Sequence, residues 1–160
     1  MHKLHIRPGV AGDAELIYTL ISELAEYEKL SHEVVATPDS LRESIFSPNS
    51  ASEVLIAELD DQPVGFALFF TTYSTFLAKE GIYLEDVYVR PAFRGRGVGK
   101  QLLAEVARIT VQRGGGRFEW SVLDWNTPAI EFYDSLGAKP QGEWIRYRIV
   151  GNELEALAGS

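Results

Sequence analysis

The spacing of hydrophobic residues along the chain changes several times, and each spacing predicts either a helix or a strand. Between residues 16 and 24, apolar side chains recur three and four positions apart, which is typical of a helix with one buried face. Asp13 is placed to cap this helix, and residues 26–28 close it. The apolar positions that carry this prediction are Leu16, Ile17, Leu20, Ile21 and Leu24.

Shorter apolar runs, bounded by glycine, proline and acidic turn residues, predict strands. Asp60-Asp61-Gln62-Pro63 separates two such runs and indicates a hairpin. Further along, Gly114-Gly115-Gly116 ends a helix that carries an apolar stripe. The predicted strands are 4–7, 54–59, 64–72, 82–89, 118–123 and 144–150, and the predicted helices are 13–28, 41–46, 101–112, 126–136 and 153–158. The order predicts an α/β fold, with hairpins first and alternating strands and helices in the second half. At 160 residues, we expect one domain over residues 1–160.

Charge is distributed unevenly along this acidic chain. The formal net charge is -8, which does not favour nucleic acid as a partner. Residues 90–117 nevertheless hold seven lysines and arginines against one acid, Glu105. We therefore expect an anionic cofactor at this basic segment and a cationic substrate beside it. Arg108, Arg113 and Arg117 are also explained as the solvated face and end of a helix.

Composition excludes several other classes of site. The chain has no cysteine, which excludes disulfides, thiolate metal sites and a cysteine nucleophile. The three histidines lack regular spacing, so we expect no metal site. No apolar run reaches the length of a membrane span, and the N-terminal residues lack the apolar core of a signal peptide. We expect a cytoplasmic protein without a membrane partner.

The most informative motif is the segment 94–100, which follows the strand-like run 82–89 and opens a helix-like run. Its glycines allow backbone N–H groups to converge on one point, and a helix N-terminus adds the positive end of its dipole. Three cationic side chains, Arg94, Arg96 and Lys100, lie next to the glycines in the sequence. The combination favours an anion, and a phosphate or pyrophosphate above others.

Two nucleotide motifs do not fit this segment. A dinucleotide fingerprint needs a third glycine where Lys100 or Leu102 stands. A P-loop needs glycine where Arg94 stands and a hydroxyl residue where Gln101 stands.

Arg94-Gly95-Arg96-Gly97-Val98-Gly99 does satisfy the pattern Arg/Gln-x-x-Gly-x-Gly/Ala, and it resembles the acetyl-CoA loop of the GNAT superfamily of N-acetyltransferases. Other segments along nearly the whole chain resemble the spermidine/spermine N-acetyltransferase branch, which includes diamine and thialysine acetyltransferases. These are Ile6-Arg7-Pro8, residues 23–28, Gly65-Phe66-Ala67, residues 83–86, Trp125-Asn126 and Phe132-Tyr133.

The resemblance implies a mixed, mostly antiparallel sheet flanked by helices, with a splayed strand pair that forms the acetyl-CoA slot. A bulge in one strand is implied as well. The backbone of the loop would hold the pyrophosphate, and the strand before it would pair with the pantetheine arm. The implied cofactor residues are Val87, Tyr88, Val89, Arg94, Gly95, Arg96, Gly97, Val98, Gly99, Lys100, Asn126, Pro128, Ala129 and Tyr133.

Tyr133 stands at the position of the family's proton-donating tyrosine, which implies that it is the general acid. A phenol with a pKa of about 10 is protonated at neutral pH and can donate to a leaving thiolate. A buried tyrosine with one hydrogen bond is the alternative for Tyr133. Asn126 is explained by cofactor contact, by helix capping, or by both.

Glu85 and Asp86 interrupt an otherwise apolar strand, where an acid is costly unless it is paired or functional. Simple strand alternation predicts that they point to opposite faces of the sheet. The resemblance places Glu85 at the amine site, to bind a cation or relay a proton, and leaves Asp86 a structural or amine-binding role. The implied substrate contacts are Tyr27, Glu28, Glu85, Asp86, Glu119, Trp120, Ser121 and Glu143.

These features predict a homodimeric enzyme that transfers an acetyl group from acetyl-CoA to a small primary amine by direct attack in a ternary complex. Polyamines, diamines and lysine analogues are the expected acceptors. Residues 119–121 and the length of 137–144 depart from the polyamine branch, which leaves the acceptor open. A protein or peptide acetyltransferase and a non-catalytic acyl-CoA-binding module are the alternatives.

Overall fold

The computed structural model describes residues 2–160 and contains one five-stranded sheet in the order β1-β2-β3-β4-β5. Neighbouring strands from β1 to β4 are antiparallel, whereas β5 runs parallel to β4. The mostly antiparallel sheet expected from the resemblance is thus confirmed. The strands are β1 (Leu4–Pro8), β2 (Ser52–Leu59), β3 (Gln62–Ser74), β4 (Lys79–Val89) and β5 (Phe118–Trp120).

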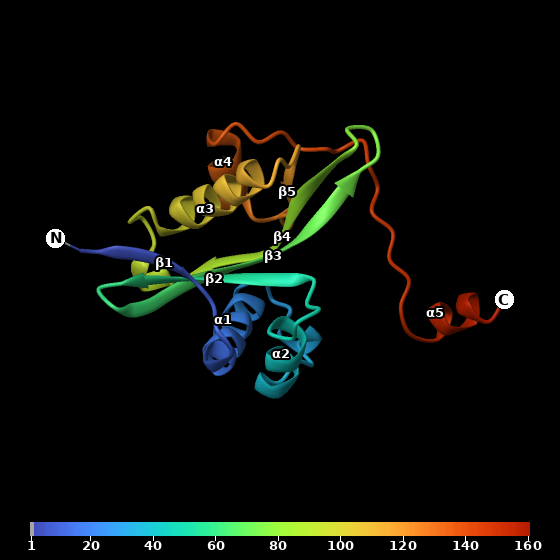
Figure 1. Cartoon of the computed structure of the whole chain (residues 1–160), viewed down its shortest axis with the longest axis horizontal. Coiled ribbons are helices and arrows are strands. Elements are labelled where there is room, and N and C mark those ends of the chain that lie inside the picture. Colours follow the sequence, from blue (N-terminus) through green and yellow to red (C-terminus); the bar gives the residue numbers. More distant parts are fainter. Residues whose placement is uncertain (1) are drawn as a thin grey trace. The chain divides into compact units, whose positions relative to one another are not determined.

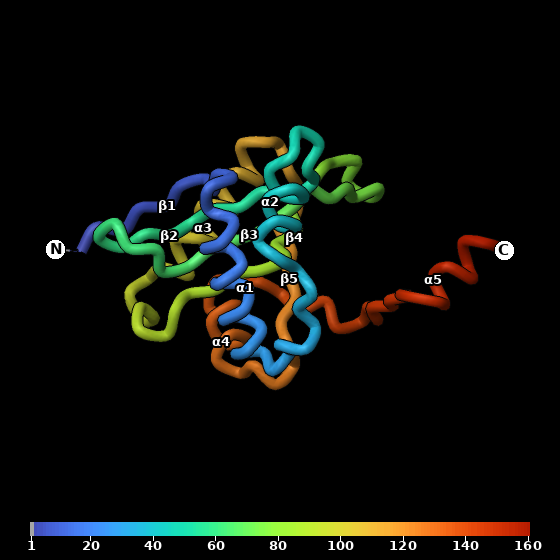
Figure 2. Tube along the Cα trace, turned by 90° about the horizontal axis from the view of Figure 1, so that it is seen from below, coloured from blue at the N-terminus to red at the C-terminus, as the bar shows by residue number. Residues whose placement is uncertain are grey.

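Helices cover both faces of this sheet (Figure 1). Helices α1 (Ala14–Tyr27) and α2 (Pro38–Ile45) lie on one face, and α3 (Val98–Gln112) lies on the other. Figure 2, seen from below, shows α1 lying over the strands. Thr37 caps α2, because its hydroxyl accepts the Ser40 amide at 3.1 Å. Three short 3-10 turns complete this part: Ala11–Asp13, Ser31–Glu33 and Pro91–Phe93.

The core under α1 explains why the apolar stripe forms a helix there. Ile17 and Leu20 are completely buried against Ile56 and Phe66 of the sheet, and Tyr88 belongs to the same cluster. Burial of each large side chain stabilises the fold by about 1.5–3 kcal/mol. This packing fixes α1 against β3 and β4, the strands that carry the candidate site.

The chain divides into two units, Met1–Ser121 and Val122–Ser160. The second unit contains α4 (Thr127–Ser135) and α5 (Gly151–Ala158). The single domain expected over residues 1–160 stays a prediction.

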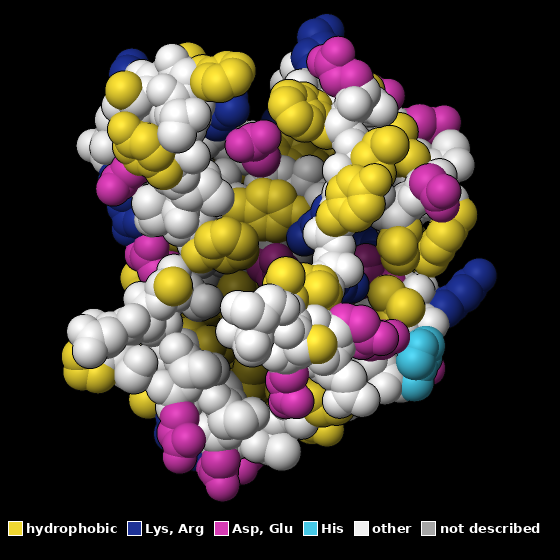
Figure 3. All heavy atoms as spheres, turned by 90° about the vertical axis from the view of Figure 1, so that its right-hand side faces the viewer, with side chains coloured by type: hydrophobic (Ala, Val, Ile, Leu, Met, Phe, Trp, Pro, Cys, Tyr) yellow, Lys and Arg dark blue, Asp and Glu magenta, His cyan; other side chains and the backbone are white. Residues whose placement is uncertain are grey.

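The strand expected at residues 144–150 is wrong. This segment has no regular structure in the described chain, and Trp144, Ile145 and Tyr147 are 75%, 78% and 89% exposed. A strand requires a neighbouring strand for its backbone hydrogen bonds, and the alternating sequence alone does not supply one. The strand expected at 118–123 likewise ends at Trp120. Figure 3 shows that hydrophobic side chains reach the surface beside acidic ones.

Asp13 does not cap α1 as expected, although it occupies the N-cap position. Its carboxylate accepts the Val10 amide at 2.8 Å and pairs with the Arg7 guanidinium at 2.8 Å. The paired arginine holds the pKa of Asp13 below its usual range. Asp13 therefore ties β1 to the start of α1.

Candidate active site

A β-bulge at Glu85 shapes the centre of the candidate site. Leu84 lies opposite Phe69 and Asp86 lies opposite Leu68, so Glu85 has no direct partner on β3. Directly opposite residues share a face of the sheet, whereas Phe69 and its neighbour Leu68 face opposite sides. Leu84 and Asp86 therefore face opposite sides although they are two residues apart. Simple alternation therefore fails between Leu84 and Asp86, because the bulge shifts the register. The expectation that Glu85 and Asp86 face opposite sides stays a prediction.

The strands β4 and β5 separate at the same bulge. In the described part of the chain, β5 pairs only with Ile82–Leu84. The following stretch of β4, Glu85–Val89, keeps its partner β3 but has no strand on its other edge. The early end of this pairing agrees with the splayed strand pair that the resemblance implied, and the acetyl-CoA slot itself stays a prediction. Its open edge presents backbone groups to whatever lies beside β4.

The glycine loop follows β4 directly and leads into α3. Gly95 and Gly97 have φ values of 77° and 80°, a conformation that other residues adopt only at a cost. Gly97 is also the N-cap of α3, and the first helical bond runs from the Gln101 amide to the Gly97 carbonyl at 3.0 Å. The preceding amides of α3 have no carbonyl partner within the helix. This end of α3 carries the backbone donors and the positive dipole that an anion requires.

Two cationic side chains of the loop lie over aromatic rings. The Arg94 guanidinium is 4.9 Å from the centre of the Tyr27 ring and 5.8 Å from that of Tyr88. The Arg96 guanidinium is 5.6 Å from the centre of the Phe93 ring. All three distances fit cation–π attraction. Because both guanidinium groups already contact aromatic rings, the backbone of the loop is the more accessible set of donors for an anion.

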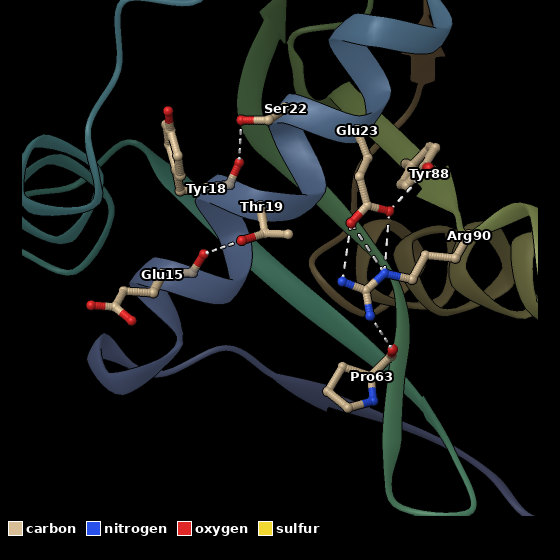
Figure 4. A network of polar contacts seen from close by, with 8 residues as sticks. All are labelled: Glu15, Tyr18, Thr19, Ser22, Glu23, Pro63, Tyr88 and Arg90. Carbon is tan, nitrogen blue, oxygen red and sulfur yellow. Dashed lines mark hydrogen bonds and ion pairs between the residues drawn. The ribbon is translucent and has the colours of Figure 1, made fainter.

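A polar network that sequence reasoning missed ties the end of β4 to α1 (Figure 4). The Glu23 carboxylate accepts the Tyr88 hydroxyl at 3.2 Å and pairs with Arg90 at 3.1 Å. Arg90 also donates to the Pro63 carbonyl at 3.1 Å. The sequence did hold a signal for Glu23, because an acid three residues after Leu20 lies on the buried face of the helix.

Three carboxylates meet where the end of α1 faces the bulge. Burial, together with the charges of Glu85 and Glu28, raises the pKa of Asp86 to about 7. Burial also raises the pKa of Glu28 above its usual value. The structure thus brings together three predicted substrate residues. A cation bound among them would relieve their mutual repulsion.

The predicted substrate residues of β5 lie beside β4. Glu119 is opposite Tyr83 and Trp120 is opposite Leu84, just before the bulge. The Ser121 hydroxyl lies 2.5 Å from that of Tyr83, and the Trp120 ring is 4.9 Å from the Phe118 ring. Glu119 is exposed.

The second unit carries the remaining predicted residues. Asn126 caps α4, because its Oδ1 accepts the Ala129 amide at 3.4 Å, and Pro128 lies in the first turn. The Tyr133 ring on α4 is 5.6 Å from that of Phe132. Glu143 is exposed in the irregular segment before α5.

Within residues 2–160, no three His, Asp or Glu side chains are arranged to hold a metal ion. Among the helices described, none combines the length and apolar character of a membrane span.

Comparison with known proteins connects this geometry to named enzymes. Thialysine N-epsilon-acetyltransferase of Sus scrofa is 38% identical over 99% of this chain and 99% of its own length. L-ornithine N5-acetyltransferase NATA1 of Arabidopsis thaliana is 33% identical over 95% of this chain and 86% of its own. Spermidine/spermine N(1)-acetyltransferase-like protein 1 of Homo sapiens is 33% identical over 99% of this chain but only 24% of its own.

Solved structures have the same fold. An integron cassette protein from the mobile metagenome of V. cholerae superposes with a TM-score of 0.82 at 28% identity, over 98% of both chains. An aminoglycoside N-acetyltransferase in complex with CoA gives a TM-score of 0.75 at 24% identity, over 93% of this chain and 96% of its own. The model of the acetyltransferase (GNAT) family matches residues 17–138. The chain is therefore an enzyme of the GNAT family of acetyltransferases.

Proposed function

We propose that this acetyltransferase moves the acetyl group of acetyl-CoA to the primary amine of a small cationic substrate. One observation carries the proposal. The open edge of β4 at the Glu85 bulge is followed at once by a glycine loop and the N-terminus of α3. A thioester arm and its pyrophosphate need these two features next to each other.

The residues fit the donor at both ends. The amides of Gly95–Lys100 would hold the pyrophosphate, since Gly95 and Gly97 adopt the left-handed conformation and an added Cβ would meet nothing within 4 Å. The open edge of Val87–Val89 would bond the pantetheine arm through the backbone. We propose the same donor-side role for Asn126, Pro128 and Ala129 of α4. When bound, acetyl-CoA supplies the activated acetyl group.

The acceptor side is acidic. Glu28, Glu85 and Asp86 lie close enough for their charges to interact, and a protonated amine would be attracted to them. The names of two relatives, a thialysine and an ornithine acetyltransferase, describe acceptors of this cationic kind. We therefore propose a diamine or a lysine-like amino acid as acceptor. Tyr27, Glu119, Trp120, Ser121 and Glu143 are proposed as further contacts.

The proposed chemistry needs a neutral amine, a polarised carbonyl and a protonated leaving group. Glu85, exposed at the bulge, would take the amine proton directly or through water. A backbone N–H on the open edge of β4 would donate to the thioester oxygen. The Tyr133 phenol would donate its proton to the leaving thiolate, so that the amine attacks directly while both substrates are bound.

Replacement of Tyr133 tests the assignment of the acid. Tyr133→Phe keeps the ring and removes only the proton donor, so turnover should fall by about two to four orders of magnitude. Affinity for acetyl-CoA, measured by calorimetry, should stay within about threefold because the ring still packs. The matched control Tyr73→Phe removes a hydroxyl from an exposed position of β3 and should change neither value. Unchanged turnover in Tyr133→Phe would show that another group protonates the thiolate.

We also propose that the protein is a homodimer. Large apolar side chains without cover support this: Phe76 at the tip of the β3–β4 hairpin is 88% exposed, and Tyr147 is 89% exposed. The cytoplasmic location and the absence of nucleic-acid and membrane partners stay predictions from the sequence.

A further inference from the structure

Arg94 lies between the proposed donor site and the proposed acceptor site. It precedes the first glycine of the loop, and its Nε donates to the Val89 carbonyl at 3.0 Å. Its guanidinium is 4.9 Å from the centre of the Tyr27 ring. Tyr27 is the last residue of α1, and Glu28 follows it as the C-cap. One side chain thus joins the pyrophosphate loop to the helix end that faces the amine site.

The helix end that Arg94 contacts is well defined. Lys29 takes a φ of 62°, and the Leu30 amide returns to the Ala25 carbonyl at 2.8 Å, which closes α1. Tyr27 and Glu28 therefore move together with the last turn of α1. A shift of this turn would move both residues, and Glu28 is one of the carboxylates that act on Asp86.

The other side of Arg94 is fixed to the core. Its guanidinium is 5.8 Å from the centre of the Tyr88 ring, which is only 6% exposed. The Tyr88 hydroxyl donates to Glu23, and Glu23 is paired with Arg90. Tyr88 is therefore a rigid support, whereas Tyr27, at 38% exposure, lies at the surface. Arg94 itself is exposed, so a loop that is fixed by a bound anion would hold its guanidinium more firmly on the Tyr27 ring.

We propose that Arg94 is a positioning residue that couples the two sites through the Tyr27 ring. When the pyrophosphate fixes the loop, Arg94 is retained on Tyr27 and orders the end of α1, which improves binding of the amine. By linkage, a bound amine raises affinity for CoA by the same factor. The proposal rests on the proposed function, because it takes the loop and the acidic cluster as donor and acceptor sites.

Binding of CoA, with and without saturating thialysine, measures this coupling without turnover. We expect thialysine to tighten CoA binding to the unaltered enzyme by about two- to fivefold, the size that a partly exposed cation–π contact supports. Tyr27→Leu, which removes the ring, should bring this factor close to one. Tyr27→Phe, which keeps the ring, should retain it. Equal coupling in Tyr27→Leu and the unaltered enzyme overturns the proposal. Equal loss of coupling in Tyr27→Leu and Tyr27→Phe also overturns it, because the coupling would then depend on the Tyr27 hydroxyl.

A second measurement needs no amine. We expect CoA alone to slow backbone hydrogen exchange of residues 24–30 in the unaltered enzyme and in Tyr27→Phe, but not in Tyr27→Leu. If CoA slows exchange in the loop alone, Arg94 does not transmit the signal and the proposal is wrong. An enzyme that acetylates no amine yet shows protection of residues 24–30 would contradict the proposed function and leave the link standing. If the enzyme acetylates thialysine but shows neither protection of residues 24–30 nor coupling, the proposed function stands and the role of Arg94 is wrong.

Discussion

Asp86 is the residue whose surroundings depart most from those of an ordinary carboxylate. It lies on the face of β4 that packs against α1, and two acids, Glu85 and Glu28, act on it. Its pKa of about 7 means that it is about half protonated at neutral pH. A bound cation would favour the charged form, so the amine and Asp86 should promote each other's charge.

This gives a prediction for the pH dependence of amine binding. As pH rises through about 7, Asp86 ionises and the KM for thialysine should fall, whereas Asp86→Asn should flatten this part of the profile. The exposed control Glu43→Gln on α2 removes one negative charge elsewhere and should keep the dependence of the unaltered enzyme. An Asp86→Asn enzyme with the full pH dependence would assign the titration to Glu85 or Glu28.

The raised pKa of Asp86 also leads to a prediction of how the free energy of unfolding changes with pH. A carboxyl with a raised folded-state pKa favours the fold below its unfolded value of 3.8, and this contribution is lost as pH rises through about 7. At about 1.4 kcal/mol per pKa unit the loss is at most about 4 kcal/mol, and less where water screens the site. Asp86→Asn should therefore gain stability relative to the unaltered enzyme between about pH 5 and 8, measured by urea unfolding. A constant difference across this range would contradict the burial of Asp86.

At the scale of elements, the loop and α3 show which structural features can be predicted from the sequence alone. Glycines followed by an apolar helical stripe predicted a loop that leads into a helix, because local backbone conformation and helix period are both encoded locally. The bulge at Glu85 was implied by resemblance alone. It arises from the register between β3 and β4, a non-local property that neither strand encodes by itself. The Glu23–Arg90 pair was missed for the same reason, since its partners are far apart in the sequence.

A pair of glycine variants distinguishes the cost of a positive φ from the steric cost of an added Cβ in this loop. Gly97→Ala forces a side chain into a φ of 80° and should lower the free energy of unfolding by about 1–2 kcal/mol. Gly99→Ala is the matched control, because its Cβ would meet only Val89 Cγ2 at 3.7 Å, an ordinary contact. Alanine there should be neutral or stabilising within α3. Thermal unfolding measures both, and equal stability of the two variants would show that the loop tolerates another conformation at position 97.

At the scale of the whole molecule, the segment 144–150 is the clearest departure from expectation. Its alternating apolar residues predicted a strand, and among the described residues this segment has no regular structure. Local pattern can indicate that a segment suits a strand, but only a partner can satisfy its backbone. This exposed segment is the main support for the homodimer proposed above.

Solution mass tests the role of this segment. We expect a dimer by light scattering, and we expect Tyr147→Ser together with Ile145→Asp to shift it toward monomer by removing apolar contacts. Val35→Ser, at a position 91% exposed near α2, should leave the mass unchanged. A double variant that remains fully dimeric would place the interface elsewhere.

Acetyl transfer across a panel of amines tests whether this protein acetylates a small cationic amine. Purified enzyme, acetyl-CoA and each of thialysine, ornithine, spermidine and lysine-containing or N-terminal peptides are combined, and free CoA and the acetylated product are measured. The account predicts that a small cationic amine gains one acetyl group with matching release of CoA, and that peptides react more slowly. Acetylation of peptides in preference to every small amine, or CoA binding without transfer to any acceptor, would contradict it.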